Sequence, residues 1–121
     1  MTAPLTPPLA LDYLRRLSAD IRAAIVLDAA GNRLAGPEPL AAPARAHVAQ
    51  APLVAASTPA GHVFSARDDR HAVLAATGPL ALPGLTIHDL RTVLLALGGG
   101  IAEGPPAEGS RAAAEAVLTA L

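Results

Sequence analysis

The sequence predicts an α/β domain of the α+β type, in which one antiparallel sheet carries helices on both faces. Three observations predict it. Apolar residues recur at three- and four-residue steps in some segments, short apolar runs follow one another across tight turns, and several of these runs are apolar at nearly every position. With 121 residues, 52% of them apolar and 16% charged, the chain suits one small globular domain.

The N-terminal part of the chain predicts a helix followed by a β-hairpin. Thr6 is placed to cap the helix, and Pro7 stands at its first position, where the missing N–H costs nothing. The helix buries one stripe of apolar residues: Ala10, Tyr13, Leu14, Leu17 and Ile21. Residues 23–27 and 33–35 then read as two strands, because the Asp, Gly and Asn residues between them favour a turn.

The middle of the chain predicts a second helix and three further strands. The helix spans residues 40–50, and it begins at Pro43 or bends there, since a proline beyond the first turn breaks the hydrogen-bond ladder. The strands are 53–57, 61–67 and 71–77. The turns between them are short enough for antiparallel neighbours, which makes a five-stranded antiparallel sheet in all.

The last third of the chain predicts a third helix, a linker and a short C-terminal helix. Thr86 and Asp89 have the spacing of a capping box ahead of apolar residues on one helical face, and Gly98 begins a glycine run that stops the helix. The order is therefore α-β-β-α-β-β-β-α plus a short helix. We divide the chain into a main domain (1–98), a Gly/Pro linker (99–109) and a C-terminal helix (110–121).

The composition excludes several classes of protein. The chain has no lysine and no cysteine, so it holds no P-loop lysine, no lysine nucleophile, no disulfide and no cysteine zinc site. Its nine arginines are dispersed, and Tyr13 and Phe64 are its only aromatic residues, which argues against nucleic-acid binding. Its longest apolar run, 93–97, is far too short to insert in a membrane. We expect a cytoplasmic protein.

The four histidines predict no metal site. In the expected hairpin Arg67 lies opposite His71, which puts His62 roughly 17 Å from His71 at about 3.4 Å per residue. His47 and His88 have no histidine or carboxylate three or four residues away on their helices. We expect the histidines to be exposed or to cap turns.

The remaining polar residues predict no catalytic or cofactor site. No serine stands in a Gly-x-Ser-x-Gly motif, and Asp68 and Asp69 read as a solvated turn. The glycine run at 98–100 ends a helix, whereas a dinucleotide-binding fingerprint begins one. We therefore expect no catalytic residues, no cofactor and no enzyme activity, but a binding or scaffold module.

Four segments of the chain carry a resemblance to a known family. They are residues 14–17, 24–31, 61–67 and 89–94, and together with the element order they resemble the roadblock / dynein light chain family, in particular its small bacterial regulators of Ras-like GTPases. The resemblance covers about residues 9–98. It implies a roadblock-like α/β sandwich that forms homodimers and binds a small Ras-like GTPase, with no catalytic residues to carry over. The linker and C-terminal helix depart from the family pattern.

The second helix is the candidate interface. Alanines at its outward positions, which we take as Ala41, Ala44, Ala49 and Ala51, would let another backbone approach closely. We expect a homodimer surface on this helix and the adjoining strand edge, at Ala41, Ala44, Val48 and Ala51. The alternative is a small cytoplasmic sensor, a ligand-binding domain or an accessory subunit of a larger complex. A pocket ringed by polar groups would favour the sensor, and a wide, flat apolar patch would favour protein interaction.

Overall fold

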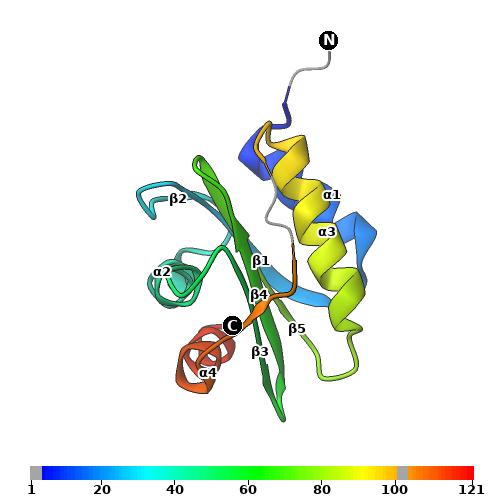
Figure 1. Ribbon diagram of the computed structural model, residues 1–121, viewed down its shortest axis with the longest axis vertical. Helices are drawn as coiled ribbons and strands as arrows, with labels where there is room; N and C mark the ends of the chain where they lie inside the picture. The colour runs from blue at the N-terminus through cyan, green and yellow to red at the C-terminus, as the bar shows by residue number, and fades with distance from the viewer. Residues whose placement is uncertain (1–3, 101–103) are drawn as a thin grey trace.

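The protein folds as one sheet between two layers of helices (Figure 1). The computed structural model describes residues 4–100 and 104–121. In chain order its elements are α1 (Pro7–Leu17), β1 (Ile21–Asp28), β2 (Arg33–Ala35), a 3-10 turn (Glu38–Leu40), α2 (Ala41–Val48), β3 (Leu53–Thr58), β4 (Gly61–Arg67), β5 (His71–Thr77), α3 (Pro83–Ala96), β6 (Ala107–Glu108) and α4 (Arg111–Thr119).

The strands lie in the order β2-β1-β5-β4-β3-β6. All neighbours are antiparallel except β3 and β6, which are parallel. The predicted antiparallel sheet with helices on both faces is thus confirmed, and the structure adds a sixth strand. This strand, β6, has only two residues, which pair with Val54 and Ala55 at the edge of β3.

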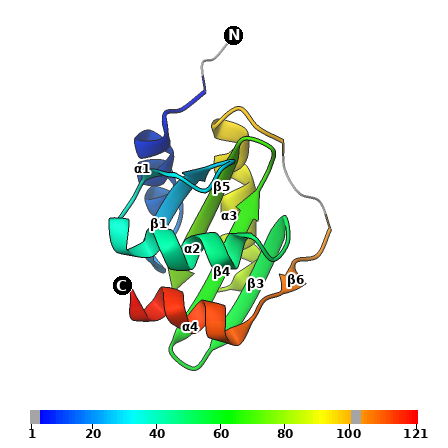
Figure 2. The same ribbon diagram turned by 90° about the vertical axis from the view of Figure 1, so that its left-hand side faces the viewer.

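Each face of the sheet is covered by a different pair of helices, α1 with α3 on one side and α2 with α4 on the other (Figures 1 and 2). Successive side chains of a strand point to opposite faces. Along β1, Ala24 and Val26 accordingly join the core under α1 and α3, while Ile25 and Leu27 join the core under α2 and α4. Because both faces are covered, the strands are apolar at nearly every position.

Two of the predicted helix starts are wrong. Helix α2 begins at Ala41, so Pro43 lies in its first turn, where an N–H has no partner within the helix and no bend is needed. Helix α3 begins at Pro83, and Thr86 is buried within it. The Thr86–Asp89 pair therefore does not cap the helix; the useful signal was the proline, which favours the first helical position.

The hairpin of β4 and β5 differs from the prediction by one residue of register. Arg67 lies opposite Ala72, and His62 lies opposite Thr77. The turn is shaped by Asp68, whose Oδ1 accepts hydrogen bonds from the backbone N–H groups of Arg70 and His71, both at 2.8 Å. His62 and His71 still lie at opposite ends of the hairpin. None of the helices in the described part of the chain has the length and apolar character needed to span a bilayer.

Candidate functional site

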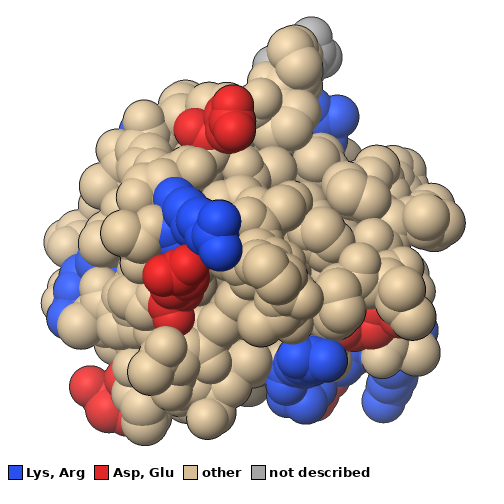
Figure 3. All heavy atoms as spheres, turned by 90° about the horizontal axis from the view of Figure 1, so that it is seen from below, with Lys and Arg blue, Asp and Glu red and all other residues tan. Residues whose placement is uncertain are grey.

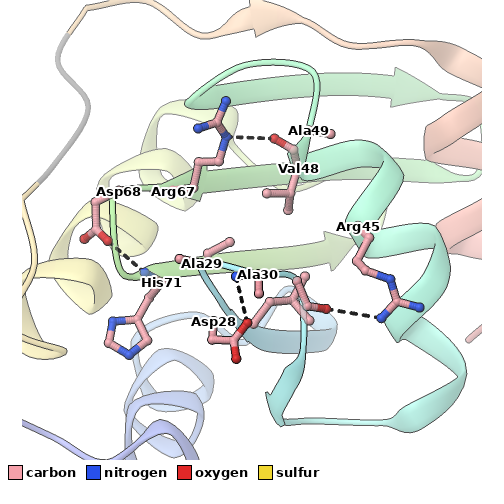
Figure 4. A pocket seen from close by; sticks show the side chains of 12 residues that line it. Asp28, Ala29, Ala30, Arg45, Val48, Ala49, Arg67, Asp68 and His71 are labelled. Atoms are coloured by element: carbon pink, nitrogen blue, oxygen red, sulfur yellow. Dashed lines mark hydrogen bonds between the residues drawn. The ribbon is translucent and has the colours of Figure 1, made fainter.

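A pocket of about 390 Å³ lies at one end of the sheet, where the β1–β2 turn, the β4–β5 turn and the C-terminal end of α2 meet (Figure 4). Leu27, Val48 and Ala72 are among its apolar lining residues. Its charged residues are Asp28, Asp68, Arg45 and Arg67, and His71 also lines it.

Both carboxylates of the pocket are used to shape turns. Asp28 accepts hydrogen bonds from the backbone N–H groups of Asn32, at 2.8 Å, and Ala30, at 2.9 Å. These bonds hold the pKa of Asp28 below its usual value, and the bond from Asn32 has the largest effect. The carboxylate is therefore ionised at neutral pH. Asp68 holds the β4–β5 turn as described above, but its Oδ2 is a buried atom without a hydrogen-bond partner.

The two arginines of the pocket are held by backbone carbonyl groups. Arg45 donates to the carbonyl of Gly31 at 3.2 Å, and Arg67 donates to the carbonyl of Val48 at 3.1 Å. The ion pairs of the described residues are Arg33–Glu38 and Arg111–Glu115, so neither pocket arginine is neutralised by a paired carboxylate. The pocket places no nucleophile beside a base, and residues 4–100 and 104–121 contain no cluster of three His, Asp or Glu side chains that could hold a metal ion.

A second feature is the apolar surface formed by α1, α3 and the loop that leads into α3. Of nine large apolar side chains exposed among the described residues, seven lie there: Leu9, Tyr13, Leu17, Leu80, Leu82, Leu85 and Leu95. Leu80 is 90% exposed. We call this set the leucine face.

Helices α1 and α3, which carry most of the leucine face, lie side by side and run in opposite directions (Figure 1). The N–H of Leu5 donates to the carbonyl of Ala96 at 2.8 Å, which joins the start of α1 to the end of α3. Leu17, at the other end of α1, therefore lies toward Leu82 and Leu85 at the start of α3. Figure 3 views the molecule from this end, where charged side chains are scattered and most of the visible surface is uncharged.

The residues predicted as an interface on the second helix are buried or half-buried, although exposed positions were expected. Ala41, Ala44 and Val48 are at most 8% exposed and belong to the core under α2, so the predicted outward orientation of Ala41 and Ala44 is wrong. Ala51 is half-buried just beyond the helix. Alanine occurs on every side of α2, so its sequence did not reveal which side faces the sheet. That α2 takes part in a homodimer stays a prediction.

The chain's own C-terminal segment covers the surface beside α2. We call residues 104–121 the tail. Its helix α4 packs against α2 and β3, with Ala114 and Val117 fully buried, while β6 pairs with the edge of β3 (Figure 2). The strand edge expected to join a second copy is thus occupied, over Val54 and Ala55, by the tail.

His47 lies beneath the tail and is 0% exposed. Its Nδ1 lies 3.0 Å from the hydroxyl of Ser65, whereas its Nε2 is buried without a hydrogen-bond partner. Burial lowers the pKa of His47 to about 4, so the ring is neutral at pH 7. The expectation that the histidines are exposed or capping is wrong here.

Comparison with known proteins identifies the fold. No protein-family model matches the chain, and no curated protein matches it. A Roadblock/LC7 domain from Streptomyces avermitillis is similar in structure, with a TM-score of 0.63 and 17% identity over 72% of this chain and 93% of that one. MglB, in a structure with a tetrameric arrangement, is similar with a TM-score of 0.57 and 14% identity over 93% of this chain and 88% of that one. The chain has a roadblock fold, as its sequence resemblance predicted.

Proposed function

We propose that this chain is a non-enzymatic interaction module that binds a small Ras-like GTPase and acts as its regulator or scaffold. The observation that carries the proposal is the leucine face. The roadblock fold and the sequence resemblance supply the class of partner, and a chain without lysine suits a module whose partner performs the chemistry.

The leucine face has the composition of a protein-binding surface. Its large apolar side chains are exposed to water. A partner that covers them lowers the free energy of the system by about 25 cal/mol per Å² of apolar area removed from water. The exposed charges Asp12, Arg15 and Arg16 stand on the same helix as three of these side chains. An apolar centre with charged residues around it is the usual anatomy of an interface.

We also propose that the module works as a homodimer in the bacterial cytoplasm. The resemblance implies such a dimer, and the leucine face lies on the opposite side of the sheet from α2 and the tail (Figure 1). A GTPase and a second copy of the chain would therefore occupy different sides of one protomer.

The test is direct binding of the full chain to the Ras-like GTPases of the same genome, each loaded with GDP or with a GTP analogue. We expect binding that depends on the nucleotide and weakens at least tenfold in Leu82→Ser and Leu85→Ser. Leu121→Ser is the matched control, because Leu121 is 52% exposed against 60% for Leu85 but lies after α4. Absence of binding in both nucleotide states overturns the proposal, and an equal loss in Leu121→Ser refutes the leucine face as its site.

A small-molecule sensor is the second candidate, and one observation favours it. The pocket of Figure 4 holds two arginines without paired carboxylates and two buried atoms without partners, Asp68 Oδ2 and His71 Nδ1. A small carboxylate or phosphate would suit the arginines. Thermal-shift titrations with such anions test it: Arg67→Ala should abolish any shift that the wild type shows. Arg70→Ala, which replaces an exposed arginine of the β4–β5 turn that does not line the pocket, should not.

A further inference from the structure

The loop between β5 and α3, residues 78–82, carries the most exposed part of the leucine face (lower right in Figure 1). Leu80 is 90% exposed and Leu82 is 63% exposed, whereas Ala81 between them is buried. Of the large apolar side chains in the described part of the chain, Leu80 is the most exposed. A leucine on an unconstrained loop folds back against the protein, because this removes it from water. The loop therefore needs contacts that hold it outward.

Part of this constraint comes from the sequence of the loop itself. Pro79 and Pro83 flank the two leucines, and each proline fixes its own backbone φ. The N–H of Ala81 donates to the carbonyl of Gly78 at 3.4 Å, which closes a turn around Leu80 with a proline at its second position. These features limit the shapes that the loop can take, but they do not fix its direction relative to the sheet.

His62 of β4 supplies that direction. Its Nε2 lies 3.1 Å from the carbonyl oxygen of Pro79, directly before Leu80. A carbonyl oxygen only accepts, so Nε2 carries the proton of this hydrogen bond. On the other side of the ring, Nδ1 lies 2.8 Å from the hydroxyl of Ser57, the residue opposite His62 in the pairing of β3 with β4. A partner on each nitrogen fixes the orientation of the ring.

The contacts around His62 join the loop to a rigid part of the sheet. Phe64, two residues along β4 and on the same face, is fully buried, and its ring centroid lies 5.8 Å from that of His62. The guanidinium of Arg22 lies over the base of the loop, where a Cβ on Gly78 would be 3.2 Å from Nη2. Arg22 Nη1 also donates to the carbonyl of Ala60 at 3.3 Å, in the β3–β4 turn. The loop is thus attached to β1, to β4 and to this turn.

We infer that His62 is a positioning residue of the leucine face, which holds the 78–82 loop in the conformation that presents Leu80 and Leu82 to the partner. The inference rests on the proposed function and deepens it, because it names what sets the shape of that binding surface. A surface that is ordered before binding loses less conformational entropy when the partner arrives, so the hydrogen bond from His62 raises affinity through the loop. Ser57 supports it by fixing the orientation of the ring.

Two substitutions of His62 test this role. The amide nitrogen of a glutamine can take the place of Nε2 and donate to the Pro79 carbonyl, whereas an asparagine is too short to reach it. Chymotrypsin cuts after leucine, and it cuts the Leu80–Ala81 bond faster when the loop leaves its turn. We expect cleavage there, followed by mass spectrometry of the native full-length chain, to be at least fivefold faster in His62→Asn and unchanged in His62→Gln. The rate in Ser57→Ala should lie between them.

His71→Asn is the matched control. It replaces another half-buried histidine of the same hairpin, at the opposite end, whose Nδ1 has no hydrogen-bond partner, so cleavage after Leu80 should keep the wild-type rate. Equal rates in the wild type and in His62→Asn overturn the inference. An increase in His71→Asn as large as that in His62→Asn also overturns it, because the cause would be general loosening of the fold. If His62→Asn does not fold, Ser57→Ala decides, and a wild-type rate there counts against the inference.

Binding of the same variants to the Ras-like GTPases of the same genome, loaded with a GTP analogue, tests whether the partner uses the positioned loop. His62→Asn should bind at least threefold more weakly than the wild type, and His62→Gln should restore the wild-type affinity. Equal affinities of the wild type and His62→Asn overturn the inference alone, since the proposed function then stands. If the wild type binds no GTPase in either nucleotide state, the proposed function fails and the inference fails with it.

Discussion

The two sides of the sheet are built from different residues, although they cover the same strands. On one side α1 and α3 bury large side chains, among them Leu14, Leu90 and Leu94. On the other, α2 and α4 bury mainly small ones, such as Ala41, Ala44 and Ala114, together with His47. Since the free energy of burial scales with apolar area, the first side contributes more of the stability.

The largest expected effect comes from a core leucine on the α1 and α3 side. Leu90→Ala should lower the free energy of unfolding by about 3 kcal/mol. The variant loses the favourable free energy of transferring the deleted methyl groups from water into the core, and it leaves a cavity under α3. Val117→Ala, at an equally buried position of α4, should cost about 2 kcal/mol or less, since it removes fewer atoms. Urea denaturation monitored by circular dichroism measures both. A larger loss in Val117→Ala would reverse the comparison.

The pH dependence of stability should come from the α2 and α4 side. The pKa of His47 is about 4 in the folded chain against an ordinary 6.5, so between these values the unfolded chain binds more protons. Stability should therefore fall as the pH drops from 6.5 toward 4, by up to about 3 kcal/mol in total. Urea denaturation at several pH values measures the slope.

Substitution of single histidines isolates this effect. His47→Leu should flatten the slope between pH 6.5 and 4.5, whatever it does to stability at pH 7. His88→Leu, which replaces an exposed histidine of α3, should keep the slope of the wild type. Equal slopes in the wild type and in His47→Leu would show that His47 is not the titrating group.

A smaller and more local effect is expected where the tail meets β3. Gly109→Ala forces Val54 or the tail to move and should weaken docking of α4 by about 1–2 kcal/mol. Hydrogen exchange of the α4 amides should then be roughly tenfold faster, while that of α3 stays unchanged. Gly84→Ala is the matched control, because a Cβ there meets no atom within 4 Å. Unchanged exchange in α4 would mean that the close approach of Gly109 is not needed for docking.

The smallest effect is expected at the cap of α4. Ser110→Ala removes the hydroxyl that accepts from the N–H of Ala113, and loss of such a cap costs about 1 kcal/mol. Exchange should accelerate in the first turn of α4 and nowhere in α3. Thr6→Ala should have less effect, since the Thr6 side chain makes no capping hydrogen bond to α1. The reverse ranking would contradict the caps seen in the structure.

The sequence predicted the sheet well because its turns are marked by specific chemistry. The strands 53–57, 61–67 and 71–77 agree with β3, β4 and β5 to within a residue, since Gly61 and the aspartates near residue 68 fix where each strand stops. The register of the last hairpin differed by one residue, because a turn shaped by side-chain hydrogen bonds does not show its pairing in the sequence.

The features missed by the sequence are those that depend on distant contacts. Strand β6 has two exposed residues and no apolar pattern, and only its pairing with β3 makes it a strand. The burial of His47 depends on Gly109, which lies 62 positions later in the chain. The leucine face was missed although its residues do have an apolar pattern. Leu17 and Tyr13 fit an apolar stripe, but α3 does not cover them, and only the packing shows which leucines remain outside.

The two edges of the sheet differ in a way that limits how large an assembly can grow. Strand β2 has only three residues, and its Arg33 is held in an ion pair with Glu38 at 2.6 Å, so this edge offers little backbone to another chain. The β3 edge is longer, and the tail covers only part of it. Strand pairing between copies would therefore use the β3 edge alone, and an assembly built in that way would end at closed pairs and would not propagate into fibres.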